Sequence, residues 1–298
     1  MARRLAALSL SLSLPLRTAL LLPARAPRRR PLLARLSVSA TDPKPPPSPE
    51  QDFLVRNDRN DVQLLSCPTM PVLEQGLLEL HSEPHICVAG ESNAGKSSLI
   101  NHLLGKKNLA RASSVAGKTR AVDLMLVNQR LVIADLPGLP SRDHQVEFQW
   151  EKSWRPLVLE YARRCEPLRA MLYVHDVRWK VSSLCREFLA EVQAMGVPVL
   201  LVLTKDDRLP AEGPELHKLR VKQAKRIKAS LGLADSVHLH YSVDSSLASS
   251  RKARRQLLRY IESMAALEDR DECRELLVGL AAKKRGAPSA REGEGDLA

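Results

Sequence analysis

The stretch ICVAGESNAGKSSLIN, from Ile86 to Asn101, decides the fold of this chain. Its first residues are apolar and predict a buried strand that runs into Gly90, while the lysine and serines after Gly95 open a helical pattern. Gly90 to Ser97 has the spacing G-x-x-x-x-G-K-[ST], in which glycines let the backbone wrap round phosphates and the helix start adds partial positive charge. We therefore predict a phosphate-binding loop, against the alternative of a glycine turn with a capping serine.

The residues of this loop have separate predicted tasks. The Lys96 ammonium would reach the two terminal phosphates of a nucleotide, and the Ser97 hydroxyl would bind Mg²⁺. The predicted nucleotide contacts here are Gly90, Glu91, Ser92, Asn93, Ala94, Gly95, Lys96, Ser97 and Ser98. The loop alone does not separate ATP from GTP, or a kinase from a molecular switch.

A second candidate segment closes a later apolar run and consists of Asp135, Leu136, Pro137 and Gly138. An aspartate at the carboxyl end of a strand is placed to hold a metal-bound water, and the amide of the glycine can reach the terminal phosphate. The alternative is a plain turn, because D-x-x-G is a common tetrapeptide. Its position after a phosphate loop and a hairpin favours the functional interpretation.

A third candidate segment predicts which purine is bound, and it consists of Thr204, Lys205, Asp206 and Asp207. In the pattern [NT]-K-x-D the last carboxylate accepts two hydrogen bonds from guanine, and the lysine stem lies along the purine plane. Adenine lacks that donor pair, and an unpaired buried polar group costs about 1–3 kcal/mol. The segment therefore predicts guanine, although a charged loop after a strand is the alternative.

Two weaker signals complete the candidate site. Tyr241, Ser242 and Val243 follow the last predicted strand, where a serine and a backbone amide can approach the guanine oxygen. Gly117, Lys118 and Thr119 precede the predicted hairpin, and the Thr119 hydroxyl could bind Mg²⁺ with GTP and let go after hydrolysis. A plain loop is the alternative in both places. We predict Lys96, Thr119, Asp135 and Gly138 as the catalytic residues.

Strand and helix patterns alternate through the middle of the chain. Strands are predicted at 85–89, 122–127, 131–135, 170–175, 199–204 and 236–241, and helices at 96–104, 147–164, 182–195, 216–231 and 251–266. Asn128 and Gln129 lie in the short turn between the second and third strands, which predicts an antiparallel hairpin. The fold class is therefore α/β, with three αβα layers around a mostly parallel six-stranded sheet that has one antiparallel strand.

The ends of the chain differ in composition from its middle. Residues 1–41 hold eight arginines and no acid, so removing them lowers the formal net charge from +12 to +4. That composition predicts an organelle transit peptide, mitochondrial first, with a plastid signal, secretory entry or a plain tail as alternatives. The apolar run from Leu5 to Leu22 contains Pro15 and Arg17, so we expect no stable membrane span.

The remaining organisation follows from proline, charge and cysteine content. We predict a proline-rich linker over 42–60, one folded α/β domain over 61–270 and a charged, disordered tail over 271–298. The five cysteines are odd in number and have no CxxC spacing. This argues against a disulfide framework or a zinc site and fits a reducing compartment.

With these motifs in place, the chain resembles the EngB type of the TrmE–Era–EngA–EngB–septin group of P-loop GTPases. The resemblance covers about 80–261 and is carried by GESNAGKSSLIN, LARASSVAGKTR, VIADLPG, WEKSWRPLVLEYARR and VLLVLTKDDRL. It implies a Mg²⁺-dependent GTPase that assists assembly of the large ribosomal subunit, and bacterial relatives are linked to cell division and septation. It also implies that Asn93 helps to bind K⁺, although a loop-stabilising side chain is the alternative.

The sequence departs from the family pattern in both predicted switch regions. Glu91 occupies the position of the family's usual arginine, and Val115 and Ala116 occupy the positions of a usual Thr-Pro pair. Leu139 begins a segment that lacks the family's usual aromatic residues, and Val243 occupies the position of a common serine. Because Leu139 cannot orient a water by hydrogen bonding, we predict slow intrinsic hydrolysis that K⁺ or a ribosomal partner raises. The departures bear on switch movement more than on nucleotide binding.

Three functions remain open at this level. The first is a GTP-hydrolysing assembly factor for an organellar large ribosomal subunit or its rRNA, a monomer without a DNA partner. The second is a P-loop ATPase or kinase, against which TKDD argues, and the third is a non-hydrolysing GTP-dependent module that binds RNA or a membrane. Basic residues of the last helices could contact rRNA or simply form solvated faces: Lys222, Lys225, Arg226, Lys228, Arg251, Lys252, Arg254 and Arg255.

Overall fold

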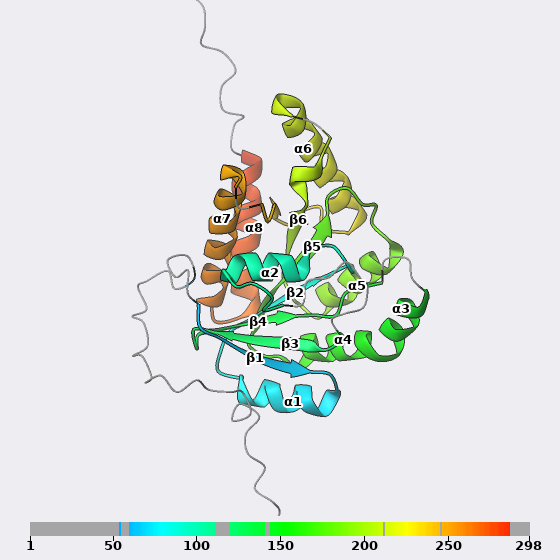
Figure 1. The fold of residues 1–298 in the computed structure, drawn as a ribbon, viewed down its shortest axis with the longest axis vertical. Helices are drawn as coiled ribbons and strands as arrows, with labels where there is room; N and C mark the ends of the chain where they lie inside the picture. Colours follow the sequence, from blue (N-terminus) through cyan, green and yellow to red (C-terminus); the bar gives the residue numbers. More distant parts are fainter. Residues whose placement is uncertain are drawn as a thin grey trace, which may run out of the picture. The chain divides into compact units, whose positions relative to one another are not determined.

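A computed structural model describes residue 54 and residues 60–110, 120–140, 144–210, 212–244 and 246–286, without the side chains of 144–146, 285 and 286. The strands are β1 (Val62–Cys67), β2 (His85–Gly90), β3 (Val122–Val127), β4 (Leu131–Asp135), β5 (Leu168–Asp176), β6 (Val199–Thr204) and β7 (His238–His240). The α-helices are α1 (Met70–Glu79), α2 (Lys96–Leu104), α3 (His144–Gln149), α4 (Arg155–Arg164), α5 (Ser183–Ala194), α6 (Gly213–Ser230), α7 (Ala248–Ala265) and α8 (Arg270–Gly286). Figure 1 shows these elements in chain order.

The strands form one sheet in the order β1-β3-β4-β2-β5-β6-β7. The pairs β4–β2, β2–β5, β5–β6 and β6–β7 are parallel, and β3 is antiparallel to both of its neighbours. The predicted α/β fold class is therefore confirmed. The predicted hairpin is also confirmed, because Asn128 and Gln129 adopt left-handed φ angles of 51° and 55° between β3 and β4.

Two apolar layers enclose the sheet. On one face the buried side chains of α1, α4, α5 and α6 pack against β1 to β6, and on the other face those of α2, α7 and α8 pack against β2 to β7. Figure 1 shows α7 and α8 beside each other, with α2 crossing the same face. The runs of β2, β4 and β6 are buried along their whole length, as expected for parallel strands covered on both sides.

Two elements at the amino-terminal side were not predicted. β1 pairs with β3 in register from Val62 opposite Val127 to Cys67 opposite Val122, and α1 covers the sheet next to it. β1 is an edge strand in which only Leu65 and Cys67 are buried. It therefore lacks the continuous apolar run that predicted the interior strands. The described sheet has seven strands rather than the predicted six.

The predicted disordered tail over 271–298 is wrong for its first part. Residues 270–286 form helix α8, which packs on the sheet through Cys273, Leu277 and Ala281. These apolar residues recur every four positions on one face, and the charged residues between them obscured the amphipathic pattern. The predicted domain boundary at 270 therefore cuts off a helix of the fold.

The predicted helix over 147–164 is divided in three. Between α3 and α4 the chain forms a π-helical turn at Trp150–Trp154, where the Arg155 amide bonds back to the Trp150 carbonyl. Pro156 follows and has no amide hydrogen for an i→i−4 bond. The wider π-helical turn accommodates this missing bond, and the chain continues as helix α4. None of the helices in the described part of the chain is long and apolar enough to cross a membrane.

Candidate nucleotide-binding site

The segments predicted from the sequence meet at one edge of the sheet. Three of them directly follow the carboxyl ends of the parallel strands β2, β4 and β6, and the fourth follows β7. Parallel strands end at a common edge, and ligands of such sheets bind there. Gly117, Lys118 and Thr119 lie outside the described residues.

The loop after β2 has the shape that its glycines predict. Gly90 has a φ of 144°, and a Cβ there would lie 2.1 Å from the Val174 carbonyl oxygen of β5. Gly95 has a φ of 102° directly before α2, and Asn93 also has a left-handed φ of 64°. The backbone therefore turns back on itself in front of the first amides of α2, where a phosphate is favoured.

Lys96 is buried and folded back on this loop. Its ammonium donates to the carbonyl oxygens of Gly90 and Glu91, both at 3.1 Å. Burial lowers its pKa, and the carboxylates of Asp135 and Glu91 oppose that shift. A phosphate placed here would offer the ammonium stronger, charged acceptors than the two carbonyls.

Asp135 is buried, and only one of its two carboxylate oxygens has a hydrogen-bond partner among the described residues. The Ser97 hydroxyl donates to Asp135 Oδ2 at 3.2 Å, while Asp135 Oδ1 is buried and has no hydrogen-bond partner among the described residues. Burial raises the pKa of Asp135 to about 7, although Lys96 and Ser97 act in the opposite direction. A hydroxyl beside an unsatisfied carboxylate oxygen fits Mg²⁺, which prefers oxygen ligands.

The segment after β4 is bound directly to the loop. The Ser92 amide donates to the Leu139 carbonyl at 2.7 Å, and the Leu139 amide donates to the Gly90 carbonyl at 3.1 Å. A Cβ on Gly138 would lie 2.8 Å from both Lys96 Nζ and Ser92 Oγ. Leu136 and Leu139 are buried and fix the segment in the core. Because the segment cannot move away, a side chain at 138 would collide with the loop, and the contact therefore depends on glycine at this position.

The end of β6 is joined to the same loop by two side chains. The Thr204 hydroxyl donates to the Ala94 carbonyl at 2.5 Å. Lys205, with a left-handed φ of 56°, donates to the Asn93 carbonyl at 2.7 Å. The predicted base-binding and phosphate-binding segments are therefore one connected structure.

The two aspartates after Lys205 have different surroundings. Asp206 is buried and binds Arg220 and His240, with 2.8 Å between Asp206 Oδ1 and His240 Nδ1. Burial alone would raise the pKa of Asp206, but these two hydrogen-bond partners hold it below its usual value. The Asp207 side chain is 29% exposed and lies 3.9 Å from Arg208 Nε. Only the second carboxylate is therefore accessible to a base.

The segment after β7 also combines buried and exposed side chains. Tyr241 is buried, and its hydroxyl lies 2.8 Å from His102 Nδ1 of α2, inside the fold. The Ser242 hydroxyl accepts from the Asp244 amide at 3.1 Å, and Val243 is exposed. Among these three predicted contacts, Tyr241 therefore has its side chain in the core rather than at the edge of the sheet.

Sequence reasoning missed a group at the end of β5 that borders the site. Asp176 Oδ2 lies 3.1 Å from Lys205 Nζ, and both Asp176 oxygens accept from Arg178. The Lys205 ammonium also lies 5.1 Å from the centre of the Trp179 ring. Asp176 ends a buried strand just as Asp135 does, so the same signal was present in the sequence.

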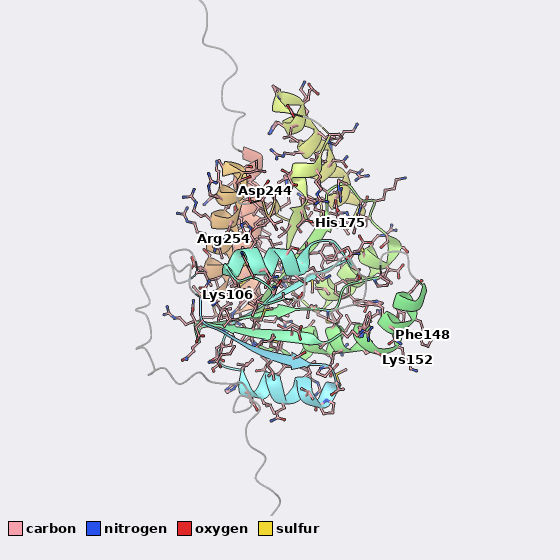
Figure 2. All side chains as sticks on the ribbon, in the orientation of Figure 1. Lys106, Phe148, Lys152, His175, Asp244 and Arg254 are labelled. Atoms are coloured by element: carbon pink, nitrogen blue, oxygen red, sulfur yellow. The ribbon has the colours of Figure 1, made fainter. Side chains whose placement is uncertain are left out.

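Glu91, which departs from the family pattern, points inward. It is buried, and its Oε2 lies 3.7 Å from His175 Nδ1 on β5. Burial lowers the pKa of His175 to about 4, so the imidazole is neutral near pH 7. Figure 2 labels His175 near the carboxyl end of β5.

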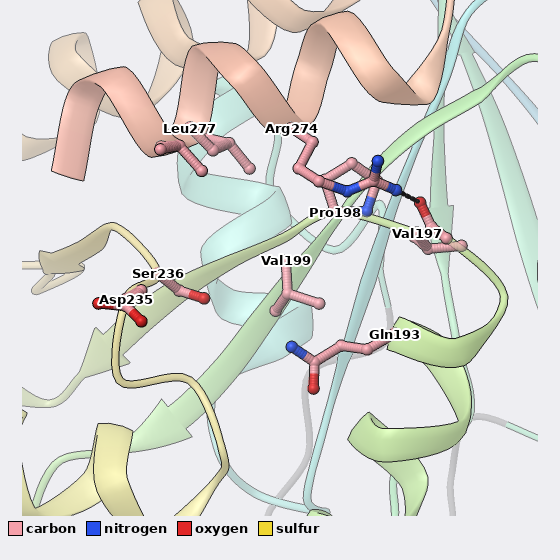
Figure 3. A pocket seen from close by; sticks show the side chains of 10 residues that line it. Gln193, Val197, Pro198, Val199, Asp235, Ser236, Arg274 and Leu277 are labelled. Atoms are coloured by element: carbon pink, nitrogen blue, oxygen red, sulfur yellow. Dashed lines mark hydrogen bonds between the residues drawn. The ribbon is translucent and has the colours of Figure 1, made fainter. Parts of the chain in front are cut away.

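A pocket of about 250 Å³ lies elsewhere, near the start of β6 (Figure 3). Its lining includes Gln193, Val199, Asp235 and Arg274. The Arg274 guanidinium donates to the Gly196 carbonyl at 2.8 Å and also pairs with Asp271. The pocket is therefore separate from the carboxyl edge of the sheet, and its main cation already has partners.

Comparison with known sequences agrees with these motifs. A family described as "50S ribosome-binding GTPase" matches residues 85–205. A protein of Protochlamydia amoebophila described as a probable GTP-binding protein EngB is 33% identical over 189 residues, 63% of this chain and 85% of the relative. The protein with the same description from Bacillus subtilis is 33% identical over 144 residues, 48% of this chain and 73% of the relative.

Solved structures are more distant. The crystal structure of a probable GTP-binding protein EngB is 19% identical, with a TM-score of 0.44, and covers 60% of this chain and 98% of that one. Toc33 from Arabidopsis thaliana in complex with GDP and Mg²⁺ is 16% identical, with a TM-score of 0.46, over 68% of this chain and 96% of that one.

Proposed function

Because the chain belongs to the EngB family of GTP-binding proteins, we propose that it is a GTPase that assists assembly of an organellar large ribosomal subunit. Membership of that family makes it a GTP-binding GTPase and sets aside the ATPase, kinase and non-hydrolysing alternatives. The observation that carries the ribosomal part is the match of 85–205 to a family described as a 50S ribosome-binding GTPase.

The site geometry supports roles for the loop residues. Lys96 and the amides around Gly95 would neutralise the phosphates, and Asp207 would accept from guanine while Lys205 supports the ring. Ser97 and the unsatisfied oxygen of Asp135, the latter through a water, would hold Mg²⁺ together with Thr119. Bound Mg²⁺ supplies positive charge to the phosphate oxygens on which negative charge develops.

We expect slow hydrolysis from this site alone. Leu139 follows Gly138 and is fully buried, so it offers no polar group to orient a water molecule. A bound K⁺ held with the help of Asn93 would supply the missing charge. Initial rates measured in K⁺ and Na⁺ buffers of equal ionic strength should favour K⁺, and equal rates would contradict the K⁺ site.

The organellar part of the proposal rests on the leader composition. Residues 1–41 contain arginine, serine, alanine and leucine without any acid. A fluorescent reporter that carries residues 1–50 should enter mitochondria, and import into plastids would select the alternative. A reporter that stays in the cytosol would contradict both.

Cosedimentation with purified large ribosomal subunits tests the main proposal. The full chain, bound to a non-hydrolysable GTP analogue, should sediment with large subunits more strongly than the GDP-bound chain. Small subunits at the same concentration serve as the control. Equal sedimentation with both subunits, or with neither, would contradict a role at the large subunit.

A further inference from the structure

Trp179 lies beside the lysine of the predicted base-binding segment. The Lys205 ammonium lies over the Trp179 ring, 5.1 Å from the ring centre. We propose that Trp179 is a positioning residue for guanine binding, and that its ring holds Lys205 in place by attracting the ammonium. The inference rests on the role proposed above for Lys205, which is to support the guanine ring, and it names the side chain that prepares Lys205 for that role.

Lys205 has a backbone conformation that needs support from its surroundings. Its φ of 56° lies in the left-handed region, which residues with a side chain rarely adopt. Such a conformation persists only where the surrounding structure holds it. The lysine side chain is also long and loses many rotamers when it is fixed. Contacts at the ammonium therefore decide whether Lys205 is ordered before a nucleotide arrives.

Three groups surround the Lys205 ammonium. It donates to the Asn93 carbonyl at 2.7 Å, and Asp176 Oδ2 lies 3.1 Å away. An ammonium has three N–H donors. The two oxygens occupy two of these donors, so the Trp179 ring is placed to attract the third. With the ammonium held at this end, the flexible carbon stem is left to lie along a purine.

Trp179 is itself fixed at the end of β5 by its backbone. Its amide donates to the Asp176 carbonyl at 3.0 Å, which closes a turn, and its carbonyl accepts from Arg226 of α6 at 3.0 Å. Within the same turn, the Val177 amide donates to the Thr204 carbonyl at 3.1 Å. Because Thr204 directly precedes the base-binding lysine, the turn keeps the ring and the ammonium at a fixed distance.

The aromatic ring supplies more than apolar contact at this position. Trp179 is half-buried and packs against the core layer that contains Tyr241 and Leu257, which an aliphatic side chain would also do. The face of an indole ring is negative and attracts a cation within about 6 Å, more strongly where water is partly excluded. The Lys205 side chain is only 26% exposed. The ring therefore adds an attraction that an aliphatic residue lacks.

A double-variant cycle on the full chain tests this inference. Calorimetric titration with GDP in Mg²⁺ buffer compares the unsubstituted chain, Trp179→Leu, Lys205→Met and the double variant. We expect Trp179→Leu alone to bind GDP about three- to tenfold more weakly. In the Lys205→Met background the same change should alter affinity by less than about twofold, because methionine keeps an unbranched stem without the cation. A loss by the same factor in both backgrounds would show that Trp179 acts by packing alone and would overturn the inference.

Two aromatic replacements keep the test decisive if leucine disturbs the fold. Trp179→Phe retains a ring face and should bind GDP within about twofold of the unsubstituted chain. A heavily fluorinated tryptophan at 179 keeps the shape of the ring but removes the negative charge of its face, so it should weaken GDP binding as Trp179→Leu does. Unchanged affinity with the fluorinated ring, or equal losses in Trp179→Phe and Trp179→Leu, would contradict an attraction by the ring face.

The remaining outcomes separate this inference from the proposed function. Trp179→Leu should weaken GDP and inosine diphosphate by the same factor, because Asp207 still reads the base edge, and a changed ratio would count against a role through Lys205. If Lys205→Met binds GDP as the unsubstituted chain does, the role proposed for Lys205 fails and this inference fails with it. If Lys205→Met binds weakly and Trp179→Leu binds normally, Trp179 alone is overturned and the proposed site stands.

Discussion

Asp206 and Asp207 are neighbours in the chain, yet their carboxylates do different work. The first is buried between Arg220 and His240, and the second is left accessible beside Arg208. The alternation follows from the single 3₁₀ turn at Asp206–Arg208, which directs successive side chains to different sides. A base reader therefore needs the second position of the pair.

Replacement of Asp207 by asparagine should change base preference. An amide donates where the carboxylate accepted, so affinity for GTP should fall at least tenfold while affinity for xanthosine triphosphate rises. Calorimetric titration with both nucleotides measures the change. Asp206→Asn is the control, and it should lower stability with little change in base preference. Wild-type GTP affinity in Asp207→Asn would remove Asp207 from the base site.

Asp176 should act as a positioning residue for Lys205. Its Oδ2 lies 3.1 Å from the lysine ammonium, which also donates to the Asn93 carbonyl at 2.7 Å. Asp176→Ala should weaken GDP binding several-fold, because Lys205 must then be ordered on binding. Calorimetric titration with GDP should be run on Asp176→Ala and on Arg178→Ala, which removes the arginine partner of Asp176 but keeps the contact with Lys205. Equal losses in both would contradict a specific role for the Asp176–Lys205 pair.

At the scale of elements, arginine side chains join helices to the backbone of neighbouring elements. Arg254 of α7 binds the last carbonyls of α2, where the helix dipole favours a cation. Arg270 of α8 donates to the carbonyls of Ala162 and Cys165 at the end of α4, and to the carbonyl of Leu168 at the start of β5. Such contacts depend on which helices are neighbours, which local sequence patterns do not reveal.

Arg254→Ala should therefore destabilise the fold while Arg255→Ala should not. Removal of the two hydrogen bonds leaves the His102 and Leu103 carbonyls without their cation, at a cost of about 1–3 kcal/mol. Arg255 is exposed, so its loss should change the free energy of unfolding by less than about 0.5 kcal/mol. Unfolding in guanidinium chloride measures both. Equal free energies for the two variants would show that the α2 contact contributes nothing.

At the scale of the whole molecule, burial of neutral histidines makes stability depend on pH. Burial lowers the pKa of His85, His175 and His238 to about 4 each. Each imidazole then binds a proton in the unfolded chain between pH 6.5 and 4 but not in the folded one. Stability is therefore fully present above pH 6.5 and is lost as the pH falls toward 4. Asp135, whose pKa is raised to about 7, acts in the opposite sense over the whole of this range.

His85→Gln tests this dependence at the most enclosed of these sites. His85 Nε2 lies 3.1 Å from the Leu80 carbonyl, which can only accept, and Nδ1 lies 3.1 Å from the Tyr161 hydroxyl. Glutamine keeps a donor but does not titrate. The loss of unfolding free energy between pH 7 and pH 5 should therefore shrink by about 2 kcal/mol. An unchanged loss would mean that His85 is protonated in the folded protein.

The sequence by itself determined the α/β fold class, the hairpin and the family. The interior strands are buried on both faces, so they appear as continuous apolar runs, and Gly90 and Gly95 have positive φ angles that favour glycine through local backbone geometry. Short-range physics of this kind is visible in a single segment.

The tertiary structure decided what depends on partners distant in the chain. β1 became a strand because β3 offered it a free edge, and α8 became a helix because the sheet could cover Cys273 and Leu277. The same holds at the site, where the Tyr241 hydroxyl lies beside His102 and the Asp176 carboxylate forms an ion pair with Lys205. Hydrogen bonds and burial between such segments form only after the chain has folded, so no local pattern in the sequence contains them.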